Sequence, residues 1–292
     1  MQSKFSISRL SPRGRVAHRD DMSWRIVSRH RGRAHGFIER LVSPGDLGEQ
    51  LKPFVFLDHL HGDIPQGAGF GWHPHSGIAT LTYQLDADTL YEDTTGQRGR
   101  VEATGLEWMR AGGGTWHRGT IQPAGARAEG FQLWIALPPT LESGPSVGIY
   151  VRPADVPQVG NARVLLGEYQ GQTCPIPVPS PLRYLDVVLA AGERWTLPVP
   201  AEHDVAWLLV YRGEARVAGE PTADELAVLG GAGELALEAT TPARVLIGTA
   251  RRHAHALVLG THSVHTSPEA LARGVAKIDE VGHELQATRR LS

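Results

Sequence analysis

Two histidines separated by one residue, His73 and His75, are the pair in this sequence best suited to bind a metal. Alternate side chains of a β-strand point to the same face, so an extended segment here would direct both imidazoles at one point. A third imidazole, His117, follows the glycine-rich turn Gly112-Gly113-Gly114 further along the chain. Neutral imidazole nitrogens bind zinc, iron, nickel and copper. The sequence therefore predicts a metal pocket with His73, His75 and His117 as its ligands.

Short apolar runs between glycines and prolines must position these histidines. The 292 residues include 34 glycines and 20 prolines, and such frequent punctuation favours many brief strands joined by turns. In the first half, 78–83 is the best strand candidate, with 54–60 and 130–137 among the others. In the second half, strand signals recur about every ten residues, as expected for another sandwich or barrel. The predicted fold class is mainly all-β.

A helix is expected only near the C-terminus. Ser267 suits the N-cap and Pro268 suits the first helical position. The apolar residues that follow repeat every three or four positions: Leu271, Val275, Ile278, Val281 and Leu285. The pattern predicts a structural closing helix that docks this stripe onto a barrel.

The domain prediction has three parts. Residues 1–143 should form a first barrel with the metal site. Residues 144–182, which are rich in proline, should form a linker and extended loop. Residues 183–292 should form a second barrel together with the closing helix.

Composition excludes several classes of protein. A formal net charge of −2 gives no basic field for nucleic acid or an anionic membrane. The single cysteine, Cys174, allows no intrachain disulfide. No apolar run approaches the roughly 20 residues that span a bilayer, and the arginine-containing start, with Pro12 followed by Asp20 and Asp21, suits neither a secretory signal nor a transit peptide. We expect a cytoplasmic protein.

Other histidines and tryptophans allow two interpretations. His59 and His61 repeat the spacing of one intervening residue, but they flank a turn after an apolar run and are expected at a pocket rim or on the surface. Three tryptophans lie close to the histidine segments: Trp72, Trp108 and Trp116. They could line a cavity suited to aromatic compounds or simply fill the core.

Three segments resemble the pirin family of bicupins: FGWHPHSGIATLTYQL, YEDTTGQRG and GLEWMRAGGGTWHRG. The family pattern runs roughly as His-Pro-His-Arg-Gly-Phe-Glu-Thr, then His-Glu-Asp, then Gln-Trp-Met-Thr-Ala-Gly-Arg-Gly, and finally His-x-Glu. The resemblance implies two tandem cupin-type β-barrels with a C-terminal α-helix. It also implies a metal site in the first barrel and a structural role for the second.

In that family the metal, usually iron, is held by three histidines and a glutamate. The histidines carry over to His73, His75 and His117, but Gly119 stands at the glutamate position. Ala79 and Tyr91 replace two further polar residues of the pattern, so the resemblance implies three changes around one pocket. A nearby acid could substitute for the glutamate, and the candidates are Glu92, Asp93, Glu102, Glu107 and Glu129.

The expected cofactor is therefore one divalent transition metal. The resemblance implies iron, while three imidazoles would also suit zinc, nickel, copper or manganese. If the changed positions have dismantled the site, it would hold no metal.

Two functions remain open. One is a metal-dependent dioxygenase that acts on a flavonol-like aromatic, of the quercetin 2,3-dioxygenase type. The other is a non-catalytic, degenerate pirin-like protein that senses redox state or a ligand and binds a protein partner. An inward carboxylate near the metal would favour the enzyme, and a plugged pocket would favour the binding module. We expect a small aromatic ligand or a protein partner, a monomer, and no direct contact with nucleic acid or membrane.

Overall fold

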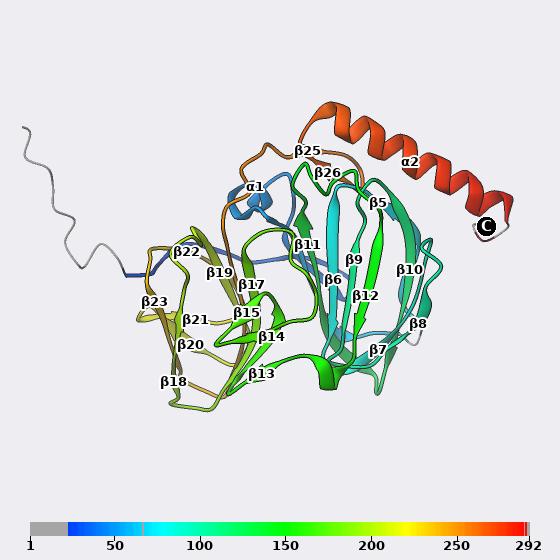
Figure 1. Cartoon of the computed structure of the whole chain (residues 1–292). Helices are drawn as coiled ribbons and strands as arrows, with labels where there is room; N and C mark the ends of the chain where they lie inside the picture. Colours follow the sequence, from blue (N-terminus) through cyan, green and yellow to red (C-terminus); the bar gives the residue numbers. More distant parts are fainter. Residues whose placement is uncertain (1–22, 66, 289, 291–292) are drawn as a thin grey trace, which may run out of the picture.

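Two β-barrels lie side by side in the computed structural model, which describes residues 23–65, 67–288 and 290 (Figure 1). The residues 1–22, which include the start considered for a leader, lie outside the described residues. No helix in the described part of the chain is long and apolar enough to cross a membrane. The prediction of a mainly all-β fold with two tandem barrels and a C-terminal helix is confirmed.

The first barrel consists of two antiparallel sheets. The larger sheet has the order β12 (Val147–Val151), β9 (Leu106–Arg110), β6 (Ile78–Gln84), β11 (Arg127–Ala136), β4 (Phe54–Asp63), β3 (Ile38–Val42) and β2 (Arg33–His35). The smaller sheet has the order β5 (Gly69–His75), β10 (Thr115–Pro123), β7 (Ala87–Asp93) and β8 (Arg98–Val101). A short helix, α1 (Leu47–Leu51), connects β3 to β4.

The second barrel repeats this plan. Its larger sheet has the order β1 (Arg25–His30), β22 (Leu226–Gly230), β19 (Val205–Arg212), β24 (Ala243–Ala250), β17 (Leu182–Leu189), β14 (Ala162–Leu166) and β13 (Gln158–Val159). Its smaller sheet has the order β18 (Arg194–Pro198), β23 (Glu234–Ala239), β20 (Ala215–Val217) and β21 (Glu220–Thr222). The short elements are η2 (Pro153–Asp155), β15 (Glu168–Tyr169), β16 (Gln172–Thr173), β25 (Val258–Leu259) and β26 (Val264–His265).

The barrels share one continuous apolar core, which includes side chains of β6 and β9 from the first barrel and of β17 and β19 from the second. Buried polar groups cross the same boundary. The Tyr83 hydroxyl donates a hydrogen bond to Asp186 at 2.8 Å, and Arg244 balances the charge of this carboxylate. Strand β19 is buried on both faces and reads as a nearly continuous apolar run in the sequence.

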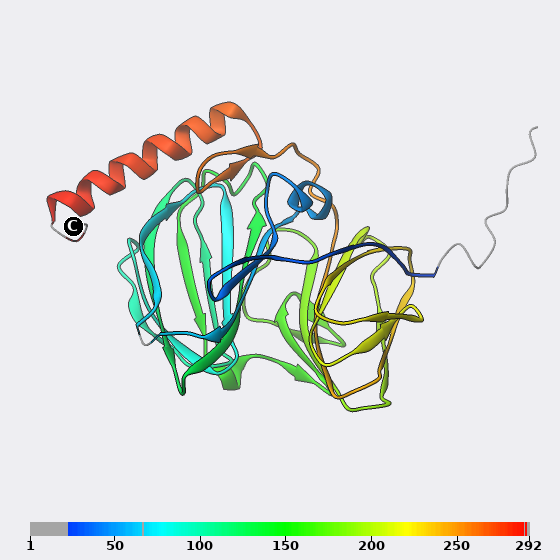
Figure 2. The same ribbon diagram turned by 180° about the vertical axis from the view of Figure 1, so that it is seen from behind.

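The two ends of the described chain are exchanged between the barrels (Figure 2). Strand β1 pairs with β22 in the second barrel, whereas the helix α2 (Pro268–Ala287) lies over the first barrel and contacts β10. The predicted cap is confirmed, because the Ser267 hydroxyl accepts a hydrogen bond from the Ala270 amide. The predicted apolar stripe is partly wrong.

The buried face of α2 consists of Ala270, Gly274, Ile278, Gly282 and Leu285. Val275, expected in the stripe, is 43% exposed. Small residues take its place because the helix lies so close to the barrel that even a Cβ at Gly274 would fall 2.5 Å from Ser76 Oγ. Apolarity alone therefore does not identify the docking face.

The predicted linker, 144–182, contains paired strands. β12 extends the larger sheet of the first barrel by pairing with β9, and β14 pairs with β17 in the second barrel. Prolines in this range lie between the strands, where no backbone amide is needed for pairing. We propose that each barrel is one domain. In this division β1 belongs to the second barrel and α2 belongs to the first.

Candidate metal centre

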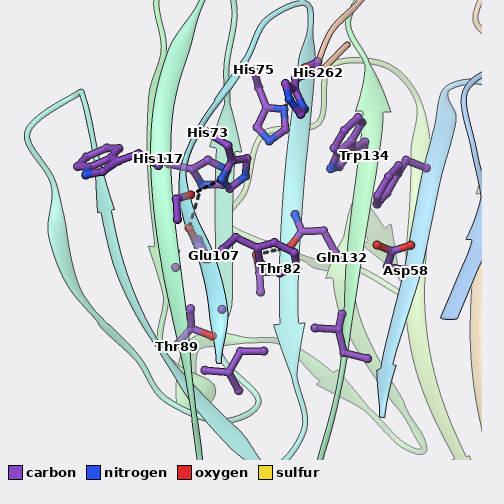
Figure 3. A pocket seen from close by; sticks show the side chains of 18 of the residues that line it. Asp58, His73, His75, Thr82, Thr89, Glu107, His117, Gln132, Trp134 and His262 are labelled. Carbon is purple, nitrogen blue, oxygen red and sulfur yellow. Dashed lines mark hydrogen bonds and ion pairs between the residues drawn. The ribbon is translucent and has the colours of Figure 1, made fainter. Parts of the chain in front are cut away.

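Three histidines converge in the first barrel from two neighbouring strands. His73 and His75 lie on β5, and His117 lies on β10 directly opposite His73. One nitrogen atom of each ring lies within 4.8 Å of the others. The rings meet at angles of 50°, 59° and 89°, so their in-plane lone pairs can point toward one position. Figure 3 shows the three rings gathered at one end of the pocket.

Backbone carbonyl groups fix the orientation of two of these rings. His73 Nδ1 donates to the Gly71 carbonyl at 2.7 Å, and His75 Nδ1 donates to the His262 carbonyl at 3.0 Å. A carbonyl can only accept, so both rings carry their proton on Nδ1 and leave a lone pair on Nε2. The Nε2 atom of His117 is buried without a hydrogen-bond partner among the described residues. This donor set fits a divalent transition metal.

Burial also keeps His73 and His75 in the neutral, metal-binding form. Desolvation, followed by the proximity of His117, lowers the pKa of His73 to about 4. The same two causes, with His73 added, place the pKa of His75 well below its ordinary value. Since only a neutral imidazole offers a lone pair to a metal, these two ligands need release no proton at neutral pH.

The cluster opens into a cavity of about 600 Å³. One wall is aromatic, because Phe56 and Trp134 stack with centroids 4.0 Å apart and planes within 8°. Arg40 lies over Phe56, 3.9 Å from the ring centroid, and pairs with the buried Asp58. Trp72 also lines the cavity. Trp134 lies edge-on to His75, with ring centroids 4.8 Å apart, and Figure 3 shows Asp58 farther from the histidines.

Of the five candidate acids, Glu107 is the one that lines this cavity. Its carboxylate lies 3.9 Å from His117 Nδ1. Glu92 pairs with Arg118 on the outside of the barrel, and Glu129 pairs with Arg212 between the barrels. Asp93 accepts hydrogen bonds from Thr95, Gln97 and Tyr150, and Glu102 is exposed.

A sequence signal for Glu107 did exist. It is the single acid in the apolar run Leu106-Glu107-Trp108-Met109, where all four residues are buried. A charge inside a buried strand requires a polar or charged environment. Alternation along β9 sends Trp108 into the core shared by the barrels and Glu107 into the cavity.

Of the three positions that depart from the family pattern, only Gly119 lines the cavity. Ala79 is fully buried in the core, and Tyr91 stacks on Tyr150 at a centroid distance of 3.7 Å. The expectation that all three surround one pocket is therefore wrong. Ala79 has the opposite strand parity to Thr82 and Gln84, the residues of β6 that line the cavity. Tyr91 is paired with Gly119 across the sheet, but its ring packs on Tyr150 and does not line the cavity.

The three tryptophans have three different environments. Trp72 lines the cavity, and Trp108 fills the core. Trp116 packs against α2 and donates from Nε1 to the Ile278 carbonyl at 2.9 Å. The prediction missed Phe56 and Trp134 as cavity residues, because distant strands bring them together.

His59 and His61 form a second group with Glu39. Their rings stack at 4.3 Å with planes within 25°, so the lone pairs run nearly parallel and do not converge. His59 Nε2 already bonds to Glu129 at 2.8 Å, and this contact lies beside Arg212 of the second barrel. The group therefore forms part of the junction between barrels and lies outside the cavity.

Sequence reasoning also missed a clamp from the C-terminal segment. Besides the His262 carbonyl on His75, Ser76 Oγ donates to Ser263 Oγ at 2.8 Å and contacts His265 Nε2 at 2.9 Å. Glu142 accepts from the Thr266 amide at 2.7 Å. This clamp, residues 262–266, holds the end of β5 in place.

Two joined β-barrels with a convergent histidine cluster in the first define a bicupin. The pirin family model matches residues 37–135. The chain is 34% identical over 223 residues to a putative quercetin 2,3-dioxygenase of Pseudomonas aeruginosa, covering 70% of this chain and 78% of that protein. It is 35% identical over 214 residues to a pirin-like protein of Caulobacter vibrioides, covering 68% and 75%.

A quercetin 2,3-dioxygenase from Acinetobacter baumannii has a similar fold, with a TM-score of 0.81 and 24% sequence identity over 87% of this chain and 96% of that one. The chain belongs to the pirin family of the cupin superfamily. The resemblance of the short histidine and glycine motifs is therefore confirmed over most of the sequence.

Proposed function

We propose that this protein is a metal-dependent dioxygenase that acts on a flavonol-like aromatic compound, with a reaction of the quercetin 2,3-dioxygenase type. The observation that carries the proposal is a cavity of about 600 Å³ with three convergent imidazoles at one end and an inward carboxylate beside them. The names of the similar proteins from P. aeruginosa and A. baumannii support the same reaction.

His73, His75 and His117 would hold one divalent transition metal, and iron is the metal that we propose. Zinc, nickel, copper or manganese would also fit three imidazoles. When bound, such an ion polarises a substrate oxygen, and a redox-active ion permits reaction of an aromatic compound with O2. The backbone carbonyls of Gly71 and His262 keep two of the rings aimed at it.

The walls of the cavity suit a flat, hydroxylated substrate. The stacked Phe56 and Trp134 form an aromatic surface, which favours an offset aromatic ring. Thr82 donates to the side-chain oxygen of Gln132 at 2.8 Å, which leaves the Gln132 amide free to donate to a substrate oxygen. Gly119 adds no side chain to the opposite wall and so leaves room for the ring system.

Binding through a hydroxylate requires an acceptor for the hydroxyl proton. Two carboxylates line the described cavity, Asp58 and Glu107. Asp58 is engaged by Arg40 through two hydrogen bonds. Glu107 pairs with no arginine among the described residues and lies beside the histidines, so it is the proton acceptor in this proposal.

The non-catalytic alternative predicts a plugged pocket. The histidines and the aromatic wall instead line one cavity of about 600 Å³, which favours the enzyme.

The test uses protein purified without a histidine tag and loaded with Fe(II) under anaerobic conditions. We expect loss of flavonol absorbance in air together with consumption of one O2 per flavonol. His117→Ala should abolish both signals. His61→Ala, which changes a histidine outside the cavity, should leave them unchanged. Metal-loaded protein that leaves both the flavonol and the oxygen untouched would refute the proposed reaction.

A further inference from the structure

We infer that Glu107 completes the metal centre, by holding His117 through its Nδ1 side and by supplying negative charge beside the three imidazoles. This inference rests on the proposed function only in that the three histidines hold a metal. Glu107 is a positioning residue in this role, because it acts on the ion through His117.

Each of the three rings has an oxygen atom on its Nδ1 side. For His73 and His75 the acceptors are the carbonyls of Gly71 and His262. For His117 the Glu107 carboxylate lies 3.9 Å from Nδ1, just beyond hydrogen-bond distance, and we assign it as the acceptor on that side. A carboxylate on this side favours the tautomer with the proton on Nδ1, which leaves Nε2 for the ion.

The Glu107 carboxylate is also buried without a compensating positive charge from the described residues. Other buried carboxylates have either an arginine, as Asp58 and Asp186 do, or several hydrogen-bond donors, as Asp93 and Glu142 do. Glu107 is 7% exposed, and no lysine or arginine in the described chain forms an ion pair with it. Burying an uncompensated carboxylate is costly. A divalent ion held by the adjacent imidazoles would supply the missing positive charge.

The cavity wall at Gly119 has space for a side chain. Gly119 lies two residues after His117 on β10 and lines the same cavity. A Cβ built there would meet its nearest atom at 3.7 Å, and the Gly119 backbone is not in the left-handed region. An acid would therefore fit at position 119. Because none is present, the carboxylate nearest the cluster comes from β9.

The experiment measures zinc affinity by competition with a chelator at pH 7, since zinc is redox-silent. Glu107→Gln should weaken binding about 10- to 100-fold, the effect typical of losing a partner of a metal-ligating histidine. The matched control is Glu102→Gln, which neutralises an exposed acid, and it should bind as the unaltered protein does. Adding Gly119→Glu to Glu107→Gln should restore a substantial part of the affinity, by returning a carboxylate to the cavity.

A second measurement needs no substitution. In metal-free protein, ¹⁵N NMR of the imidazoles should show His117 protonated on Nδ1, and Glu107→Gln should weaken this preference. Equal zinc affinity of the Glu107→Gln and unaltered proteins, or an Nε2-protonated His117 in the unaltered protein, would overturn the inference. A protein that binds zinc with this dependence on Glu107 but leaves flavonol unchanged would overturn the proposed reaction alone.

Discussion

Replacing Gly274 by alanine tests whether α2 holds the histidine strand in place. In an ordinary helix this change is favourable by about 1 kcal/mol, because alanine loses less backbone freedom than glycine on folding. Here the added Cβ would lie 2.5 Å from both Ser76 Oγ and His265 Nε2, which contact each other at 2.9 Å. One of these buried groups must move.

The expected cost follows from those contacts. Displacing Ser76 disturbs its buried interactions with His265 and Ser263, and each disturbed interaction costs about 1–2 kcal/mol. After subtracting the gain in helix propensity, the net loss in the free energy of unfolding is about 1–3 kcal/mol. Because Ser76 follows His75 directly, we also expect metal affinity to fall about tenfold.

Urea unfolding and chelator competition would be measured on Gly274→Ala and on a control, Gly282→Ala. The control gains the same propensity on the same helix, but its Cβ approaches only the Trp116 ring, at 3.0 Å. We expect Gly282→Ala to bind metal as the unaltered protein does and to have a clearly higher free energy of unfolding than Gly274→Ala. If the two variants were equally stable and bound metal equally well, the clamp on Ser76 would have no energetic importance.

Three further predictions concern the histidines, the cysteine and the junction between barrels. In metal-free protein, the pKa of His73 is about 4 when folded and about 6.5 when unfolded. Its contribution to the free energy of unfolding is therefore complete above pH 6.5, and about 3 kcal/mol of it is lost as the pH falls to 4. Urea unfolding at several pH values would detect this slope, and His73→Gln should reduce it. Cys174 is 2% exposed with its pKa raised by burial to about 11, so mass spectrometry should find it unalkylated in folded protein at pH 8 and alkylated in guanidinium. Tyr83→Phe removes a buried hydrogen bond to Asp186 and should lower the free energy of unfolding by about 1–2 kcal/mol without changing metal affinity; an unchanged urea midpoint would contradict this assignment.

Local patterns in the sequence predicted the parts of the fold that depend on neighbours along the chain. The one-residue spacing of His73 and His75, the glycine turn before His117 and the cap at Ser267 all depend on strand or helix geometry over a few residues. Strand alternation is thus enough to bring two imidazoles together.

The rest depends on pairing between distant segments. The His262 carbonyl reaches His75 from the far end of the chain, and Glu107 faces the cavity because β9 pairs with β6 in one particular register. The choice of Glu107 among five acids required this register. The residues of β1 do not indicate that this strand joins the second barrel, since either barrel could accept such a strand.

The exchange of chain ends has a consequence for the order of events during synthesis. His73, His75 and His117 leave the ribosome well before the clamp and α2, which fix the end of β5. Strand β1 is made first, yet it must wait for β22 before it can pair. Neither barrel can therefore reach its final form as a separate nascent unit, and the histidine pocket becomes complete only when nearly the whole chain has emerged.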